Sequence, residues 1–250
     1  MPIAVIRFRI ASSHDELKSE YSEEDLVDTW LDVDGRHIAN GYQRGDQNWL
    51  VFPHLAEYYF ELQSEWVTAS DNGRGHLGEI RSTYYRSVLP FVLQTQGYLA
   101  LHASSVVANG RVLTFSAPSG VGKSTLAQAF TRQGHAMWSD DSAIIAPVAD
   151  RAEVLSLPFH PRIAKISPAW VDLTENVVDL RSIREDFSPE EALRLPLHAV
   201  LMLERGEKRT QSPADLGMLR LEPNEAITAL LSQAYVFFPS QSSAQQDSLA

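Results

Sequence analysis

The chain has 250 residues, of which 44% are hydrophobic and 21% are charged. This is enough apolar material for one large domain, or for a catalytic domain with a small companion. The absence of cysteine excludes disulfides, thiolate metal sites and a cysteine nucleophile, and it fits a reduced, cytoplasmic setting. A formal net charge of -11 argues against nucleic acid as a partner.

The first residues carry the signal of a strand. Residues 2–10 are rich in β-branched side chains, and their second half alternates apolar with basic residues. Because Arg7 and Arg9 interrupt the apolar run, we expect neither a signal peptide nor a membrane span. The acidic stretch from Asp15 to Asp34 predicts a solvated surface segment that is partly helical, and a dock for a basic peptide is the alternative.

Turn and strand signals continue to residue 78. Asp34-Gly35 and Asn40-Gly41 are both two-residue hairpin signals. Strands are predicted at residues 48–52 and 57–62, and a polar, glycine-rich run over 71–78 marks a boundary. We therefore predict a small β-rich N-terminal domain over residues 1–78 and a catalytic domain over residues 79–239.

A helical pattern opens the second domain. Apolar residues recur at helical spacing from Glu79 to Gly97, and Gly97 suits the C-terminal cap. Pro90 should kink or split this helix because it lacks a backbone N–H group. A hairpin follows, with arms at 103–108 and 111–115 joined by Asn109-Gly110, and His102 stands directly before its first arm.

The second arm leads into a loop with the spacing of a phosphate-binding, or Walker A, motif. The run from Ala117 to Thr125 ends in Gly-Lys-Ser, although Ala117 replaces the first glycine of the pattern. Backbone N–H groups, a helix N-terminus and one lysine are what a polyphosphate requires. The predicted nucleotide-binding residues are Ser119, Gly120, Val121, Gly122, Lys123, Ser124 and Thr125. The alternative is a fortuitous Gly/Ser turn before an amphipathic helix.

Paired carboxylates follow the next predicted strand. Gly134 closes the helix after the loop, and a short apolar segment leads to Asp140 and Asp141. A Mg²⁺ site opposite a phosphate loop requires a carboxylate at this place. The predicted metal ligands are Ser124 and Asp140, and ATP with Mg²⁺ is the predicted cofactor pair. The residues leave open which aspartate binds metal and which accepts a proton.

The remaining chain predicts further strands and helices. Strands are expected at residues 142–148, 153–157 and 197–203, and an amphipathic helix at 222–235. Ser188-Pro189-Glu190-Glu191 has the pattern of a capped helix start. The Ser/Gln-rich residues 240–250 are expected to be disordered.

Taken together, these motifs resemble the catalytic core of the bacterial HPr serine kinase/phosphorylase family. The resemblance includes HPr-kinase-like proteins that phosphorylate serine in lasso-peptide precursors. His102 lies 21 residues before Lys123, and Asp141 lies 18 residues after it, as in the family pattern. The resemblance covers residues 97–147 and implies an α/β fold, a P-loop kinase domain of the HPr kinase/phosphoenolpyruvate carboxykinase type. It also implies the catalytic roles.

Carried over from that family, Lys123 holds the terminal phosphates and Asp141 takes the proton from the acceptor hydroxyl. Ser124 binds Mg²⁺, and His102 lies near the reacting phosphate as a cation or hydrogen-bond donor; a purely structural histidine is the alternative. Arg162, Arg205 and Arg209 could each supply positive charge to the transition state. Arg162 is preferred because its loop follows the catalytic strands, and a surface arginine is its alternative.

The chain departs from the bifunctional kinases of that family. They carry a glutamate directly after the phosphate-loop hydroxyl, where this chain has Thr125, and their downstream metal-binding glutamate and its glycine-rich loop have no clear counterpart. Both departures weaken the case for phosphorylase activity and for HPr as the substrate. Members of the family form oligomers, so a homo-oligomer is conceivable, although no stretch of the sequence marks an interface.

The sequence thus predicts a kinase that transfers the γ-phosphate of ATP to a hydroxyl. The expected acceptor is a serine in a peptide or small protein, with a lasso-peptide precursor as the sharpest version. A small-metabolite kinase uses the same core and is one alternative. The other is a non-catalytic ATP-binding regulatory module. No membrane partner is expected, and phosphoenolpyruvate carboxykinase activity is disfavoured because the chain is short and has no second cationic pocket.

Overall fold

Two mixed β-sheets, each of seven strands, and a helical layer form a mixed α/β fold. The structure is a computed structural model, and it describes residues 5–11, 20–31, 34–62, 64–73, 76–149, 151–158, 186–205 and 217–235. The expected disordered tail, residues 240–250, and Arg162 with the residues directly before it, 159–161, lie outside these ranges. None of the helices in these ranges has the length and apolar character needed to span a bilayer.

The first sheet is built almost entirely from the N-terminal part of the chain. Its strands are β1 (Ile6–Ile10), β2 (Leu26–Leu31), β3 (His37–Arg44), β4 (Gln47–Phe52), β5 (Ala56–Glu61), β6 (Trp66–Asp71) and β13 (Asp186–Phe187). They lie in the order β13-β1-β6-β5-β4-β3-β2, and only the β1–β6 pair is parallel. Strand β13 comes from far along the chain, so the later part of the sequence also contributes to this sheet.

The described part of the acidic stretch, residues 20–31, has no buried residue, as expected, and contains a one-turn 3₁₀ helix, η2 (Glu23–Asp25). It then forms strand β2, which the sequence did not predict, because Leu26 to Leu31 pair with β3. Two other expectations are wrong. Asn40-Gly41 is no turn, since both residues pair with β4 inside β3. The chain reverses instead at Gly45, whose φ of 58° suits glycine. Ser188 accepts the Glu191 N–H at 3.3 Å, yet the chain turns there into a strand rather than a helix.

The helical layer consists of α1 (Leu77–Thr83), the π-helical segment η3 (Tyr84–Val88) and α2 (Leu89–Gln94). Pro90 explains the irregular turn: without an N–H group it cannot donate to the Arg86 carbonyl one turn earlier. The Leu89 N–H donates to the Tyr84 oxygen, five residues back, which is the π-helical pattern. The predicted disturbance at Pro90 is therefore a widened turn within a continuous helical path.

The second sheet carries the predicted hairpin and leads into the loop over residues 117–122, where the sequence predicts phosphate binding. Its strands are β7 (Leu99–Leu101), β8 (Ala103–Ala108), β9 (Arg111–Ser116), β10 (Ala136–Ser139), β11 (Ala143–Val148), β12 (Arg151–Leu155) and β14 (Arg194–Met202). The order is β10-β8-β9-β14-β12-β11-β7, with only β9 and β14 parallel. Asn109 and Gly110 both have positive φ, 52° and 72°, as the predicted two-residue turn between β8 and β9 requires.

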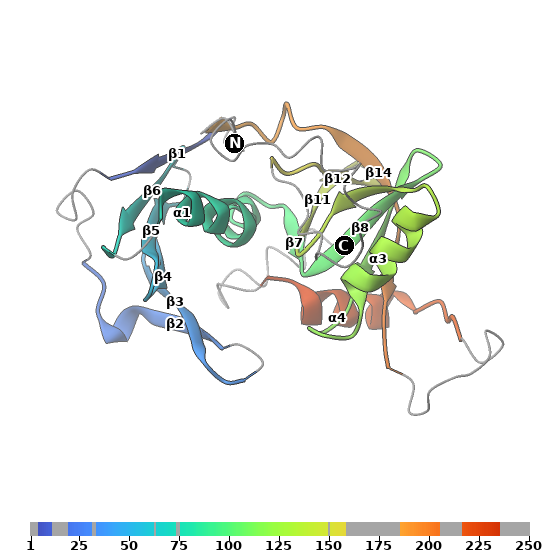
Figure 1. The fold of residues 1–250 in the computed structure, drawn as a ribbon, viewed down its shortest axis with the longest axis horizontal. Coiled ribbons are helices and arrows are strands. Elements are labelled where there is room, and N and C mark those ends of the chain that lie inside the picture. The colour runs from blue at the N-terminus through green and yellow to red at the C-terminus, as the bar shows by residue number, and fades with distance from the viewer. Residues whose placement is uncertain are drawn as a thin grey trace.

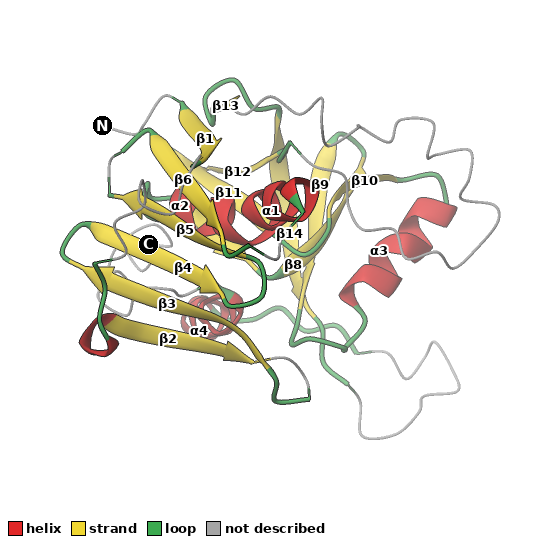
Figure 2. Ribbon diagram, turned by 60° about the vertical axis from the view of Figure 1, so that its left-hand side comes forward, coloured by secondary structure: helices red, strands yellow, loops and turns green. Residues whose placement is uncertain are grey.

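The helical layer lies between the two sheets, as both ribbon views show (Figures 1 and 2). One buried cluster joins residues of the first sheet, the helical layer and one face of the second sheet. Strand β11 illustrates the alternation: Ile144 and Ala146 belong to this cluster, whereas Ala143 and Ile145 face a second cluster that α4 (Pro223–Gln233) joins through Leu230. Helix α3 (Lys123–Arg132) packs on the second sheet through Ala127, beside Val106 and Phe115. The predicted boundary at residue 78 thus falls next to a helical layer that shares its core with both sheets.

Candidate functional site

The loop between β9 and α3 turns through two glycines with left-handed backbone conformations. Gly120 and Gly122 adopt φ values of 78° and 119°, the left-handed region that glycine enters without strain. Gly122 precedes the first turn of α3, and its carbonyl accepts the Leu126 N–H at 2.9 Å. The first N–H groups of a helix have no partner within the helix and can bind an anion. A pocket of about 240 Å³ opens at this end of α3.

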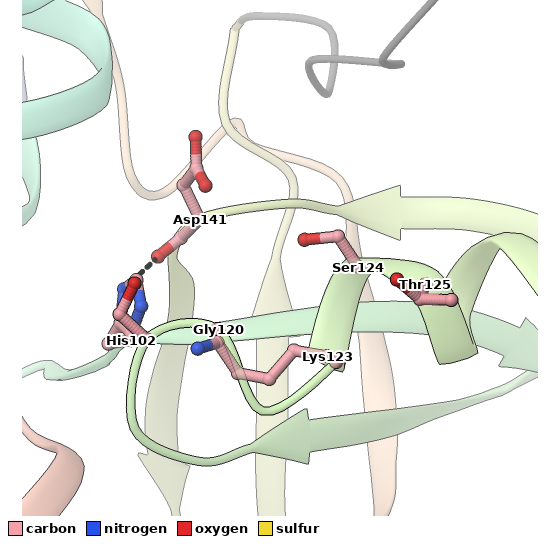
Figure 3. A pocket seen from close by; sticks show the side chains of 8 residues that line it. His102, Gly120, Lys123, Ser124, Thr125 and Asp141 are labelled. Atoms are coloured by element: carbon pink, nitrogen blue, oxygen red, sulfur yellow. Dashed lines mark hydrogen bonds between the residues drawn. The ribbon is translucent and has the colours of Figure 1, made fainter. Parts of the chain in front are cut away.

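Most of the predicted residues line this pocket. They are His102, Ser119, Gly120, Gly122, Lys123, Ser124, Thr125 and Asp141. Figure 3 shows the side chains of Lys123 and Ser124 reaching from the start of α3 toward His102 and Asp141. The fold therefore brings together residues from the start of β8, the loop before α3 and the turn after β10.

Lys123 is folded back on its own loop. Its Nζ donates to the Ala117 carbonyl at 2.8 Å and to the Pro118 carbonyl at 3.3 Å. Burial of the side chain lowers the pKa of Lys123, while Asp141 and Asp140 oppose this shift. Anionic phosphate oxygens are stronger acceptors for an ammonium group than peptide carbonyls are. The ammonium group is thus held beside the loop, where a phosphate could replace the carbonyls.

The substitution of the motif's first glycine is accommodated. Ala117 is fully buried, with an exposed fraction of 0%, and its carbonyl is an acceptor for Lys123. Among the backbone torsions, Ala117 is not one of the residues with positive φ. A methyl group at this position therefore requires no left-handed backbone.

Asp140 is the buried acceptor of two serine hydroxyls. Its side chain is 3% exposed, and its Oδ1 accepts hydrogen bonds from Ser104 at 2.5 Å and Ser124 at 2.8 Å. The two hydroxyl oxygens are themselves 3.3 Å apart. Carboxylate and hydroxyl oxygens are hard ligands of the kind that Mg²⁺ prefers. The Ser124 and Asp140 oxygens therefore fit the metal that the sequence predicts.

A metal held here would depend on ligands from outside the protein. Within the described ranges, no three His, Asp or Glu side chains gather closely enough to hold a metal ion. Mg²⁺ commonly binds through one or two protein groups together with substrate phosphates and water. Ser124 and Asp140 match this open pattern of metal binding, in which substrate and water complete the coordination.

Asp141 adopts an unusual backbone conformation and is held from several directions. Its φ is 70°, which is uncommon outside glycine, although Asp tolerates it better than most residues. The Asp141 carbonyl accepts hydrogen bonds from His102 Nδ1 at 3.2 Å and from the Tyr235 hydroxyl at 2.8 Å. Its carboxylate lies 3.6 Å from Arg86 Nη1 and is 43% exposed, so it remains accessible.

The environment of His102 fixes its hydrogen-bonding state. A carbonyl oxygen can only accept, so Nδ1 must carry the hydrogen in the bond to Asp141. Burial is the main cause that lowers the pKa of His102, and the nearby Lys123 lowers it further. Both effects favour the neutral imidazole near pH 7. His102 accordingly donates to a protein carbonyl, while its second ring nitrogen is an acceptor.

One of the three candidate arginines is placed at the loop. Arg205 Nη2 donates to the Gly120 carbonyl at 2.7 Å, and the side chain is exposed. Arg162, the preferred candidate, and Arg209 lie outside the described residues. Sequence spacing gave no reason to select Arg205, because the contact arises only from the position of the residues that follow β14.

Sequence reasoning missed three residues that contact the predicted site. Ser104 is one of two adjacent serines in β8, and this polar pair in a buried strand was the available signal. Arg86 is a basic residue within an apolar helical pattern. Tyr235 is the last residue of the helix predicted over 222–235 and lies just beyond α4 in the structure. For Arg86 and Tyr235, no local pattern indicates a contact with Asp141.

Comparison with known proteins shows a distant similarity at the level of structure. No protein-family model matches the chain, and no curated protein matches it. Among solved structures, the chain is similar to the structure of the HPr(Ser) kinase/phosphatase from Coxiella burnetii. The sequence identity is 19% and the TM-score is 0.31, over 46% of this chain and 72% of the other. This is a distant structural relationship.

Proposed function

We propose that this protein is a phosphotransferase that moves the γ-phosphate of ATP, with Mg²⁺, to an acceptor hydroxyl. The observation that carries the proposal is the convergence of Lys123, the Ser124–Asp140 pair and Asp141 at one helix N-terminus. A phosphate cradle, hard oxygen ligands and an accessible carboxylate are the parts that phosphoryl transfer needs. A simple anion-binding turn would need only the first of these.

The loop and Lys123 bind the phosphates in this proposal. Backbone N–H groups at the start of α3 donate to phosphate oxygens, and Gly120 and Gly122 give the backbone its required shape. Lys123 exchanges its carbonyl acceptors for the terminal phosphate oxygens. Arg205, already at the Gly120 carbonyl, adds positive charge on the exposed side of the loop.

Ser124 and Asp140 would hold Mg²⁺, because their oxygens adjoin the pocket and match its ligand preference. When bound, Mg²⁺ would neutralise negative charge on the phosphates. Ser104 donates to the same carboxylate oxygen and so keeps the Asp140 side chain in one orientation.

Asp141 acts on the acceptor. Its accessible carboxylate orients the acceptor hydroxyl and takes the proton as the new O–P bond forms. The bond between the γ-phosphorus and the bridging oxygen breaks, and ADP leaves with that electron pair. His102 acts through its Nδ1–H bond to the Asp141 carbonyl. A serine of a peptide or small protein as acceptor rests on the resemblance of the catalytic core, with a lasso-peptide precursor as the specific case.

The test is transfer of label from γ-labelled ATP with Mg²⁺ to a panel of acceptors. The panel contains HPr, serine-ended precursor peptides and small hydroxyl metabolites. We expect label on a peptide serine, its loss in Lys123→Ala, and a fall to a low residual rate in Asp141→Asn. Arg132→Ala removes a charge from the exposed far end of α3, and Asp46→Asn changes an exposed turn carboxylate, so we expect both matched controls to keep activity.

The results separate the proposal from its alternatives. Label that reaches only metabolites would favour the alternative of a small-metabolite kinase. Tight ATP binding without transfer to any hydroxyl would favour the regulatory module. Transfer that survives in Lys123→Ala would show that the pocket at α3 is not the catalytic site.

A further inference from the structure

Asp141 is the point at which distant segments of the chain meet. Its backbone is in the left-handed region, and its carbonyl and carboxylate have separate partners. A residue in such a conformation directs its side chain differently from one in a regular strand, so the contacts that hold it also decide where the carboxylate lies. Those contacts come from the start of β8, from the residue after α4 and from the helical layer.

Tyr235 is fixed in place independently of Asp141. Its backbone N–H donates to the Ala100 carbonyl at 2.9 Å, and the adjacent Ala234 forms a β-bridge with Leu101. Its ring lies edge-on to Phe91 of α2, with the ring centroids 5.4 Å apart. Burial raises the pKa of the Tyr235 hydroxyl, so it stays protonated and can only donate to the Asp141 carbonyl. The hydroxyl is therefore a preorganised donor.

Arg86 reaches Asp141 from the helical layer. It lies in the π-helical segment that precedes Pro90, and its side chain is 16% exposed. π-Helical turns inside α-helices are frequent at functional sites, because the wider turn changes the direction of a side chain. A guanidinium 3.6 Å from the carboxylate restricts the orientations that the carboxylate can take without removing it from solvent.

We propose that Tyr235 and Arg86 are positioning residues for Asp141, Tyr235 through its backbone carbonyl and Arg86 through its carboxylate. This inference rests on the proposed function, in which Asp141 orients the acceptor hydroxyl. Neither side chain lines the pocket, so both act through Asp141. The helical layer and α4 thereby set the geometry of the transfer step while leaving the phosphate loop unchanged.

The first experiment compares Tyr235→Phe with the wild-type protein in the labelled-ATP assay. The substitution removes only the hydroxyl, so the ring packing on Phe91 remains. We expect kcat to fall roughly 10- to 100-fold, the scale of a small misplacement of a catalytic group, with the KM for ATP unchanged. Tyr59→Phe, which removes a hydroxyl on the first sheet, is the matched control and should keep kcat.

The second experiment tests Arg86 with substitutions of graded severity. Arg86→Gln should lower kcat with the KM for ATP unchanged, and Arg86→Lys should restore part of the activity because it keeps the charge but not the planar fork. Arg151→Gln breaks the pair of Arg151 with Glu153 at 2.8 Å, in which Arg151 is exposed and Glu153 is half-buried, and it serves as the control for loss of an ion pair.

The decisive measurement is a double-mutant cycle with Asp141→Asn. If both residues act through Asp141, then Tyr235→Phe and Arg86→Gln reduce transfer much less in the Asp141→Asn background than in the wild type. Equal losses in both backgrounds, or raised KM for ATP in place of lowered kcat, would overturn the positioning role. If the wild-type protein transfers phosphate and both variants keep full activity, only the positioning role is overturned. If the wild-type protein transfers no phosphate, the proposed function is overturned as well.

Discussion

The two sheets bury very different side chains. The first sheet and the helical layer hold most of the largest fully buried residues, among them Trp49, Tyr58 and Phe60. Around the phosphate-type loop the second sheet buries small and polar residues; these include Ala103, Ser104, Ser105, Thr114, Ser116, Ala117 and Asp140. Burial of large apolar surface stabilises a fold, whereas a buried polar group costs free energy unless it is hydrogen-bonded.

Several buried hydroxyl groups of the second sheet are hydrogen-bonded. Ser105 and Thr114 are cross-strand neighbours whose hydroxyls lie 3.0 Å apart, and Ser116 donates to the His102 carbonyl at 3.1 Å. The first sheet is therefore the main source of stability, and the second sheet holds the groups of the site. This contrast predicts that stability and activity can be damaged separately.

The largest effect is expected in the first sheet. Phe60 is 1% exposed in the main core cluster, so Phe60→Ala leaves a large cavity. We expect the free energy of unfolding in urea to fall by about 3–5 kcal/mol, as for other buried Phe→Ala changes. The protein that remains folded should bind ATP as the wild type does. A loss of ATP affinity greater than the loss of folded protein would contradict the separation of the two sheets.

Asp140→Asn is the corresponding change in the second sheet. Asparagine keeps an acceptor for Ser104 and Ser124 but removes the charge that Mg²⁺ requires. We expect transfer activity to fall by about 100-fold or more, with the thermal unfolding midpoint nearly unchanged. Asp46→Asn on the first sheet's turn should leave transfer intact. Full activity in Asp140→Asn would exclude Asp140 as a metal ligand.

A smaller effect is expected for Ser104→Ala, which removes a hydrogen bond to the Asp140 carboxylate. The Mg²⁺ concentration for half-maximal transfer should rise about 10-fold, which is the lower end of the loss in metal affinity when a residue that orients a metal ligand is removed. Ser105→Ala is the matched control, because Ser105 is also buried but contacts Thr114 instead of Asp140. The same shift in both variants would indicate a general packing effect.

The smallest expected effect is the pH dependence that His102 adds to stability. Because the pKa of His102 is lowered from 6.5 in the folded protein, the unfolded chain binds a proton more readily there. The free energy of unfolding should therefore decrease as the pH falls below about 6.5. Above that pH, His102 should not make the free energy of unfolding depend on pH. Urea unfolding between pH 5 and pH 8 should show a shallower slope for His102→Gln. His54→Gln, which removes an exposed histidine, is the control, and equal slopes in wild type and His102→Gln would refute the prediction.

The sequence predicted short-range features well and contacts between distant segments poorly. The β8–β9 hairpin, the loop and the strand before Asp140 were recognisable because each depends on a few adjacent residues. The Asn40-Gly41 turn was wrong because strand pairing overrode the local preference. Strand β6 carried no recognised signal, although it pairs with β1 and β5 in the middle of the first sheet.

The same division applies to the candidate site. By itself the sequence determined the loop backbone, since glycines at 120 and 122 permit positive φ, and it determined the order of Lys123, Ser124 and the aspartates. Only the tertiary structure decided the partners of these groups: Ser104 for Asp140, and Arg86 and Tyr235 for Asp141. Tyr235 and Asp141 are 94 residues apart in the chain, and they meet because α4 packs beside β7. Local torsions are encoded by neighbouring residues, whereas such contacts depend on how sheets and helices pack.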